Sequence, residues 1–240
     1  MMKEIALSAI LFCLSMSMMA QNEKGTFSIR PMAGLNIATL NESNGNFCHT
    51  KTGVTAGLEF EYGVSRQVGL SIGMMFSQQG AEIDGSTEEH TFNQGIDHLV
   101  YSETQGKLRS NYINIPLLVN YYIPPLKGLA VKGGVQLGIR ADDRLKCETQ
   151  TVEANQYQDN VPVYTNTLMP YEYYTYNTMA TDVCKSIDFG FPIGLSYELK
   201  GVMLDARYYF GLADALSASD AKEMHNRYLS ITLSYRFHLK

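Results

Sequence analysis

The sequence predicts an all-β domain: a single eight-stranded antiparallel up-and-down transmembrane β-barrel. Three observations support this fold class. Eight segments of the 240-residue chain alternate between apolar and polar side chains, as strands do when their two faces meet different surroundings. The connections between these segments vary regularly in length, with short and long ones taking turns. Beyond residue 21 no run of about 18 apolar residues occurs, so a membrane crossing would have to use strands.

Residues 1–20 have the layout of a secretory signal peptide. Lys3 precedes an apolar run from Ile5 to Leu14, and the segment ends at Ala20, as expected for a cleaved leader. A single membrane anchor is the alternative, but the run is short for a membrane-spanning helix and contains serine. We therefore expect the barrel domain to comprise residues 21–240.

The expected strands are bounded by turn residues or polar stretches. They lie at 27–39, 52–62, 67–79, 109–122, 128–141, 187–199, 202–212 and 227–239. The connections between them run over 40–51, 63–66, 80–108, 123–127, 142–186, 200–201 and 213–226. All the longer connections fall at one end, which is the layout of outer-membrane barrels with short periplasmic turns and long extracellular loops. With eight strands, both mature termini are expected in the periplasm.

The segment "GLAVKGGVQLGIR" at 128–140 illustrates the two faces of these strands. Val131, Leu137 and their neighbours form an apolar face, whereas Lys132 and Arg140 lie among glycines on the other face. When this alternation is followed through the other expected strands, one face is apolar and carries no charge. The other face is polar and contains equal numbers of acidic and basic residues. The charged residues of that polar face are Arg30, Glu59, Glu61, Lys132, Arg140, Asp188, Glu198, Asp205, Arg207 and Arg236.

Alternation alone does not say which face points inward, so a soluble periplasmic barrel with an apolar, ligand-binding interior is the alternative. A water-facing surface would carry many Lys and Glu and little Gly, whereas this polar face is rich in Gly and balanced in charge, as a buried face must be. Aromatic residues also gather near both ends of the apolar face, as membrane girdles do. We therefore predict that the charged residues form a network in the lumen.

No pattern in the sequence indicates catalysis, a cofactor or a metal site. Most histidines fall in the expected loops, but no nucleophile, base and acid share a recognised spacing, and no ligand spacing of a known metal site is present. An interior of eight strands is just wide enough to be filled by side chains. We expect a plugged, non-enzymatic barrel, with a narrow pore as the alternative.

Cys48, Cys147 and Cys184 fall in expected loops, in a compartment that permits disulfides. A bridge between Cys147 and Cys184 would close the longest loop near its base, and we predict this pair. Three free thiols, or a pair that includes Cys48, are the alternatives, because sequence does not fix connectivity.

The longest expected loop contains a tyrosine-rich stretch, "VPVYTNTLMPYEYYTYNTM", at 161–179. Its tyrosines are Tyr164, Tyr171, Tyr173, Tyr174 and Tyr176. Tyrosine supplies a large amphipathic contact area at low entropic cost, so this stretch is a candidate binding surface for a protein or glycan partner. Alternatively, it extends the barrel as a β-hairpin or packs as a lid.

Acidic residues outnumber basic residues in the expected loops, and the formal net charge is -5. This excess argues against nucleic acid as a partner, because such partners need a basic surface. Outer-membrane lipid around the barrel and an unidentified partner at the loops are the partners we expect.

Four stretches of the sequence resemble the PorT-type small outer-membrane β-barrels of Bacteroidota. They are "FSIRPMAGLNIA" (27–38), "GLSIGMMFSQQGAE" (69–82), "YINIPLLVNYY" (112–122) and "LSITLSYRF" (229–237). The resemblance covers nearly all of the mature chain and implies the barrel fold. A role as an accessory to secretion is the function that the family name suggests, and no catalytic residues are implied.

Overall fold

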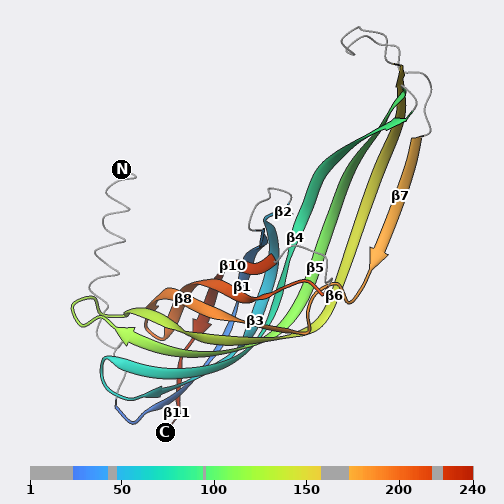
Figure 1. Ribbon diagram of the computed structural model, residues 1–240. Coiled ribbons are helices and arrows are strands. Elements are labelled where there is room, and N and C mark those ends of the chain that lie inside the picture. Colours follow the sequence, from blue (N-terminus) through green and yellow to red (C-terminus); the bar gives the residue numbers. More distant parts are fainter. Residues whose placement is uncertain (1–23, 43–47, 94–95, 158–172, 218–223, 240) are drawn as a thin grey trace, which may run out of the picture.

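The computed structural model describes residues 24–42, 48–93, 96–157, 173–217 and 224–239, so the expected leader lies outside the described residues. The described chain is built of β-strands (Figure 1). They are β1 (Phe27–Glu42), β2 (Cys48–His49), β3 (Lys51–Gly63), β4 (Val68–Asn93), β5 (Ile96–Tyr122), β6 (Leu129–Tyr157), β7 (Tyr173–Ala180), β8 (Ile187–Leu199), β9 (Val202–Asp214), β10 (Met224–Tyr235) and β11 (Phe237–Leu239). Within these ranges, no helix has the length and apolar character needed to cross a membrane.

Antiparallel neighbours close the sheet into a ring of eight strands, which confirms the predicted fold class. The order around the ring is β1, β3, β4, β5, β6, β8, β9 and β10. At the seam, β1 pairs with β10 from Met32 opposite Ser234 to Glu42 opposite Met224. β11 continues β10 past Arg236 and pairs with the start of β1. The closed ring leaves no open edge in the barrel wall, as a sheet in lipid requires.

Alternate side chains of each barrel strand point outward and inward, and the outward set is apolar. On β9, for example, Leu204 is 54 % exposed whereas Asp205 is 1 % exposed. Among the residues that the structure describes, the inward set includes nearly every buried charged side chain. The apolar face therefore surrounds the barrel and the polar face fills it, which is the reverse of a soluble ligand-binding barrel.

Aromatic rings mark both ends of the apolar face, as they do at the two interfaces of a membrane. At the end with the short turns, the rings of Phe27 and Tyr62 lie 4.8 Å apart, as do those of Tyr235 and Phe237. Near the opposite end, the rings of Tyr208 and Phe210 lie 4.6 Å apart. We call these the turn end and the mouth of the barrel.

The shortest turn, Lys200–Gly201, joins β8 to β9 at the turn end. Lys200 has a φ of 53° and Gly201 a φ of 82°. Two consecutive left-handed residues are the signature of a type I′ turn, whose twist matches that of the strands it joins. Gly201 also accepts a hydrogen bond at its carbonyl oxygen from the backbone N–H of Arg236 (2.7 Å), so this turn supports the point where β10 passes into β11.

The long connections expected at 80–108 and 142–186 do lie at the mouth end, but they are largely paired strand, so the alternative in which the longest connection extends the barrel as a β-hairpin is the one observed. β4 and β5 continue as a paired hairpin to Asn93 and Ile96, and β6 continues to Tyr157 with β7 beside it. Figure 1 shows these four strands leaving the barrel together as a curved sheet. We call this sheet, residues 81–93, 96–108, 142–157 and 173–180, the extension. Both of its faces are polar, so it lacks the alternation by which the barrel strands are recognised.

Gly190 should be essential for the packing of the barrel interior. A Cβ atom added there would meet the backbone oxygen of Phe210 and lie 2.8 Å from the Tyr209 ring. We expect Gly190→Val to prevent barrel closure, seen as loss of the fast-migrating band when unheated protein is run in SDS. Gly133→Leu is the matched control, because a Cβ there meets nothing within 4 Å. Equal behaviour of the two variants would contradict this packing argument.

Candidate functional site: the filled lumen, the mouth cap and the extension

Near the turn end, the lumen is filled by a layer of buried charges centred on Glu59. The Glu59 carboxylate contacts the guanidinium of Arg30, lies 2.6 Å from Arg207 Nη2 and lies 3.9 Å from Lys132 Nζ. Asp205 contacts Lys132 and accepts hydrogen bonds from Arg207. Because opposite charges surround each ion, the layer offsets much of the large cost of removing charges from water.

A second branch of this ionic layer is centred on Glu61. Its carboxylate lies 2.7 Å from Arg30 Nη2 and 3.4 Å from Arg236 Nη1, and it accepts hydrogen bonds from Asn120 (2.7 Å) and Tyr122 (2.5 Å). Arg236 also pairs with Glu198 (3.0 Å). Through Arg30, the two branches form one continuous network across the barrel.

Two of the ten charges predicted for the lumen network lie outside it. Arg140 is the last β6 residue before a β-bulge at Ala141, which shifts the β5–β6 register, and it pairs with Asp143 and Asp182 at the mouth (2.9 Å each). Asp188 is buried in the lumen, but it accepts a hydrogen bond from the Asn226 amide (3.0 Å) rather than an ion pair. The remaining eight residues are those of the ionic layer.

Above the ionic layer, two stacked tyrosines fill the middle of the lumen. The rings of Tyr209 and Tyr228 lie 4.8 Å apart. The Tyr228 hydroxyl oxygen accepts hydrogen bonds from the amides of Gln136 (2.7 Å) and Asn114 (3.1 Å). The space left among these residues is about 10 Å³, which is no more than one water molecule occupies.

The mouth is closed by a third, apolar layer. Leu40, Ala81, Leu108, Cys184 and Ala215 are all buried there and pack against one another. Residues 181–186 and 215–217, which we call the mouth cap, run beside each other across this layer. Hydrogen bonds from the backbone N–H of residue 185 to the oxygen of residue 215 (2.8 Å) and from residue 217 to residue 183 (2.9 Å) join the two segments.

Two carboxylates fasten the mouth cap to the barrel rim. Asp143 accepts hydrogen bonds from the backbone N–H groups of Asp182 (2.7 Å) and Cys184 (2.6 Å) and pairs with Arg140. Partial burial alone would raise the pKa of Asp143, but these hydrogen bonds and the guanidinium hold it below its ordinary value. The resulting stabilisation is present at neutral pH and is lost only as the pH falls through that lowered pKa.

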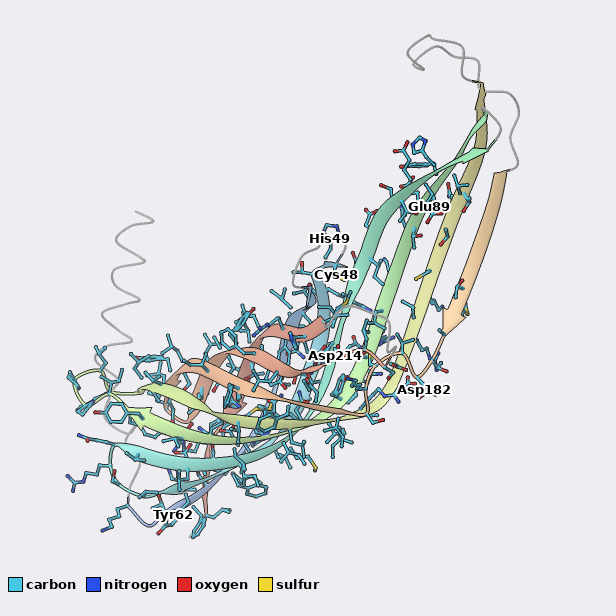
Figure 2. The ribbon with its side chains drawn as sticks, viewed as in Figure 1. Cys48, His49, Tyr62, Glu89, Asp182 and Asp214 are labelled. Carbon is cyan, nitrogen blue, oxygen red and sulfur yellow. The ribbon has the colours of Figure 1, made fainter. Side chains whose placement is uncertain are left out.

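Asp214 is the second of these carboxylates. It accepts a hydrogen bond from the backbone N–H of Met224 (3.1 Å) and pairs with Lys185 of the cap (3.0 Å). Figure 2 shows Asp182 and Asp214 close to where the extension leaves the barrel. Nothing in the sequence marked these two roles, because both aspartates fall within segments without alternation.

The disulfide predicted between Cys147 and Cys184 is not formed, and both thiols are free. Cys184 lies in the mouth cap, with its Sγ 3.0 Å from Ser110 Oγ. Cys147 lies farther along the extension, opposite Gly106 of β5. The prediction is wrong because the connection is a strand that separates the two residues, rather than a loop that returns to its base. Burial raises the pKa of the Cys184 thiol to about 11.

In the extension, β4, β5, β6 and β7 pair in sequence order, and Glu89 lies far from the barrel (Figure 2). One face carries a neutral hydroxyl surface formed by four residues, Ser102, Thr104, Thr149 and Thr151. The hydroxyl oxygens of Ser102 and Thr151 lie 3.0 Å apart, and those of Thr104 and Thr149 lie 3.1 Å apart. Most of the charged residues lie on the opposite face, whereas Glu89, paired with Val100, lies on the same face as the hydroxyl surface but farther from the barrel. Among the described strands, β7 pairs only with β6, so its other edge is open.

The tyrosines of the candidate binding surface fall partly on β7. Tyr173, Tyr174 and Tyr176 lie in this strand, opposite Val152, Thr151 and Thr149 in register. Tyr164 and Tyr171 lie outside the described residues.

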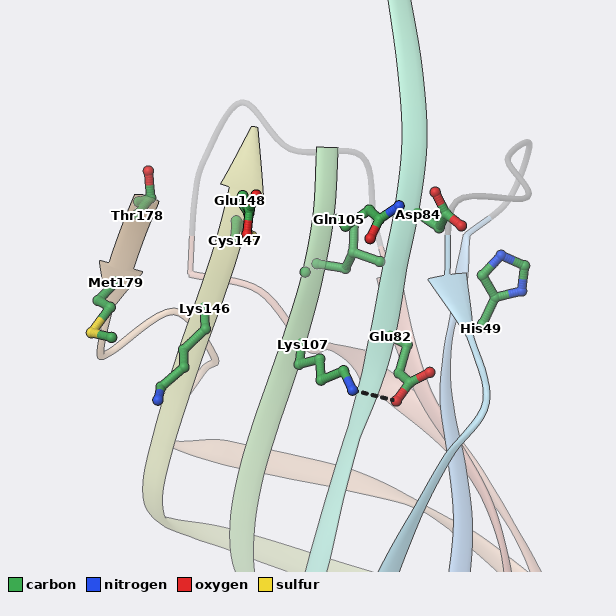
Figure 3. Close-up of a pocket in the computed structure, with 12 residues that line it drawn as sticks. His49, Glu82, Asp84, Gln105, Lys107, Lys146, Cys147, Glu148, Thr178 and Met179 are labelled. Atoms are coloured by element: carbon green, nitrogen blue, oxygen red, sulfur yellow. Dashed lines mark ion pairs between the residues drawn. The ribbon is translucent and has the colours of Figure 1, made fainter. Parts of the chain in front are cut away.

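A hollow of about 490 Å³ lies at the base of the extension (Figure 3). Residues from both faces line it: Glu82 and Lys107 from the charged face, and Ile83 and Cys147 from the other. It is therefore a pair of shallow surfaces around a single sheet rather than an enclosed cleft. Within the described residues, no group of three or more His, Cys, Asp or Glu side chains could hold a metal ion.

The comparison with protein families agrees with this architecture. A family model described as "Outer membrane protein beta-barrel domain" matches residues 19–217. The chain belongs to this family. The family and the apolar outer face of the ring place this outer-membrane β-barrel protein in the outer membrane.

Solved structures with a similar fold are also outer-membrane barrels. Ail, the attachment invasion locus protein of Yersinia pestis, is 14 % identical with a TM-score of 0.41, and the match covers 89 % of this chain and 99 % of Ail. Neisserial surface protein A is 14 % identical with a TM-score of 0.40, covering 88 % and 97 %. OprG from Pseudomonas aeruginosa is 13 % identical with a TM-score of 0.36, covering 91 % and 98 %. No curated protein sequence matches this barrel protein.

Removing the Glu59 carboxylate should strongly destabilise the barrel. Glu59→Gln would leave Arg30, Arg207 and Lys132 buried with too few counter-charges, which typically costs about 3–5 kcal/mol. Unfolding by urea in detergent micelles would measure this loss. Glu103→Gln, at an exposed position of the extension, should leave the stability unchanged. If the double variant Glu59→Gln/Arg207→Met loses less free energy of unfolding than the sum of the two single variants, the effect lies in this charge pair. A loss equal to that sum would contradict the pairing argument.

The mouth cap should protect Cys184 from reagents in water. In a background in which Cys48 and Cys147 are replaced by Ser, we expect a membrane-impermeant maleimide to label Cys184 very slowly at neutral pH. Asp143→Ala removes the acceptor of two backbone N–H groups of the cap and should accelerate labelling at least tenfold. Asp142→Ala, at the exposed neighbouring position, is the control and should have no effect. Fast labelling without any substitution would show that the cap is open in solution.

Proposed function

We propose that this protein is a non-enzymatic interaction protein of the outer membrane, which presents its extension outside the cell to a protein or glycan partner. The observation that carries the proposal is the contrast between the two halves of the molecule. The barrel is filled by three layers of side chains, whereas the extension projects from it as a single sheet with both faces exposed.

The filled lumen makes diffusion through the barrel a poor alternative. A solute would have to separate the ionic layer around Glu59, displace the stacked Tyr209 and Tyr228, and open the mouth cap. Each step would break ion pairs, hydrogen bonds or apolar contacts of buried side chains, and this costs free energy. A narrow pore therefore has less support in this structure than a closed scaffold.

The open edge of β7 offers a direct way to bind a partner. An exposed strand edge can receive a strand of another chain, with affinity from main-chain hydrogen bonds and specificity from side chains on alternate positions. The neutral hydroxyl surface beside β7, which includes Thr149 and Thr151, could contact such a strand or a glycan by hydrogen bonds. The positions of Tyr174 and Tyr176 opposite these threonines add aromatic residues to the same strand pair.

A PorT-like role as an accessory to secretion is the alternative function. The resemblance of four sequence stretches to that group supports it, and a closed barrel suits a protein that anchors other envelope components. In both roles the barrel fixes the position of the extension, and the chemistry of binding lies in the strands beyond the mouth.

Shortening the extension should separate binding from assembly. Cys147 and Thr178 are direct partners in the β6–β7 register, so replacing residues 148–177 by Asn-Gly would close a short hairpin and remove most of β7. Gly85 and Thr104 are partners in the β4–β5 register, and replacing 86–103 by Asn-Gly gives a matched deletion that keeps β7. Both variants should assemble and show heat-dependent mobility in SDS.

Binding can be followed on intact cells with a photo-crosslinking amino acid at position 180, which both variants retain. We expect a discrete crosslinked product with the full chain and the β4–β5 deletion, but not with the β6–β7 deletion. Crosslinking at position 126, at the turn end, is the control. Absence of any product from the extension, together with a steady current through the protein in a planar bilayer, would instead support transport.

A further inference from the structure

Two pairs of like charges face each other across the β5–β6 ladder. Lys107 lies directly opposite Lys146, and two positions nearer the barrel Arg109 lies directly opposite Arg144. All four residues are exposed, and the side chains of Lys107 and Arg144 are 72 % and 68 % accessible. Like charges directly opposite each other destabilise a sheet. Such an arrangement is readily tolerated where an anion lies between them.

The carboxylates nearby compensate these cations only weakly. Glu82 lies 3.6 Å from Lys107 and Asp142 lies 3.8 Å from Arg144, and such long, exposed ion pairs contribute little. Within the described chain, neither Arg109 nor Lys146 has a carboxylate at ion-pair distance. The neighbouring Lys51 reflects the local positive potential, because burial and then the charge of Arg109 lower the pKa of its ammonium group.

The four cations lie on the face of the sheet that continues the lipid-facing side of the barrel. On β4, Met74 and Phe76 point outward. Phe76 pairs with Ile113 of β5, and every second residue of β5 from Ile113 toward the extension, including Arg109 and Lys107, lies on the same outer face. Arg109 lies four residues beyond Ile113, the partner of Phe76, which corresponds to about 10 Å of height for a tilted strand. Long cationic side chains at this height reach back toward the headgroups while keeping their charge in water.

We propose that Lys107, Arg109, Arg144 and Lys146 form a binding site for the phosphate groups of anionic lipids in the leaflet at the mouth of the barrel. We call these four residues the basic belt. Figure 3 shows Lys107 and Lys146 on the neighbouring strands β5 and β6, with Glu82 beside Lys107. Guanidinium groups bind phosphate oxygens through paired hydrogen bonds, and lysines add charge. Phosphates held between the two strands would relieve both like-charge pairs.

The net acidity of the chain does not oppose this site. Asp84, Glu88, Glu103 and Glu148 lie on the same face of the extension but farther from the barrel than the basic belt, whereas Glu82 lies beside Lys107 and Asp142 lies just nearer the barrel. Salt limits the range of the repulsion from the more distant carboxylates to about 8–10 Å. Next to the membrane, the four cations of the basic belt thus outnumber the two carboxylates Glu82 and Asp142, and acidic residues predominate only farther from the barrel.

The test is to measure binding of phosphatidylglycerol to the full-length protein by native mass spectrometry, after release from phosphatidylcholine nanodiscs that contain increasing amounts of the anionic lipid. Lys107→Gln/Lys146→Gln and Arg109→Gln/Arg144→Gln should each weaken retention of the first anionic lipids, by about fivefold for each cation removed. Arg66→Gln/Lys127→Gln removes two exposed cations at the turn end and is the matched control, which should retain wild-type binding. Heat-dependent mobility in SDS would establish that each variant forms the closed barrel.

Three results would overturn the proposal. The belt variants could retain phosphatidylglycerol as well as the wild type, or the control pair could lose as much binding as the belt pairs, which would indicate attraction by overall charge. Inorganic phosphate could bind the wild type in pure phosphatidylcholine as tightly as the lipid does, which would make the site one for a soluble anion. None of these outcomes depends on a partner at β7, so the lipid site and the proposed interaction role can fail separately.

Discussion

The structure depends on the pairing of charges that the membrane forces inward. Because the outer face of the ring contacts hydrocarbon, the charged side chains of the strands have only the lumen to occupy, and there each must find an opposite charge. Glu59, whose carboxylate lies next to three cations, is the centre of this charge network. The same contacts make the barrel a solid support, because a lumen closed by ion pairs cannot also serve as a wide channel.

The fold could be predicted from the sequence to the extent that its strands face two different surroundings. Segments such as 187–199 alternate strictly because one face meets lipid and the other meets the lumen, and all eight barrel strands were found in this way. The extension has water on both faces, so Thr, Ser, Glu and Gln occupy both, and no periodicity distinguishes those residues from a loop. Its strands could only be recognised from the pairing of β4, β5 and β6 in the structure.

The candidate sites follow the same division. Eight charges of the ionic layer were accessible to sequence analysis because they lie in regular strands. Arg140 has the inward phase that the alternation predicts, but it lies at the mouth end of β6, where its partners are Asp143 and Asp182. The bulge that follows it turns Asp143 inward, and bulges leave little trace in a single sequence. The disulfide was mispredicted because its premise was a loop. The basic belt could not be predicted from the sequence, because the four cations become neighbours only through the β5–β6 pairing. The excess of acidic residues, counted over all the connections together, does not show where cations gather.

The position of the mouth cap in the chain has a mechanical consequence. Asp182 follows β7 after a single intervening residue, so a pull on the extension through β7 reaches the barrel through the cap. Such a load would act first along the β6–β7 ladder, in shear, where many hydrogen bonds resist together, and then on the clamp at Asp143. The hydrogen bonds and ion pair of Asp143 are thus the last contacts between the extension under load and the barrel, and the barrel wall itself would experience little of the force.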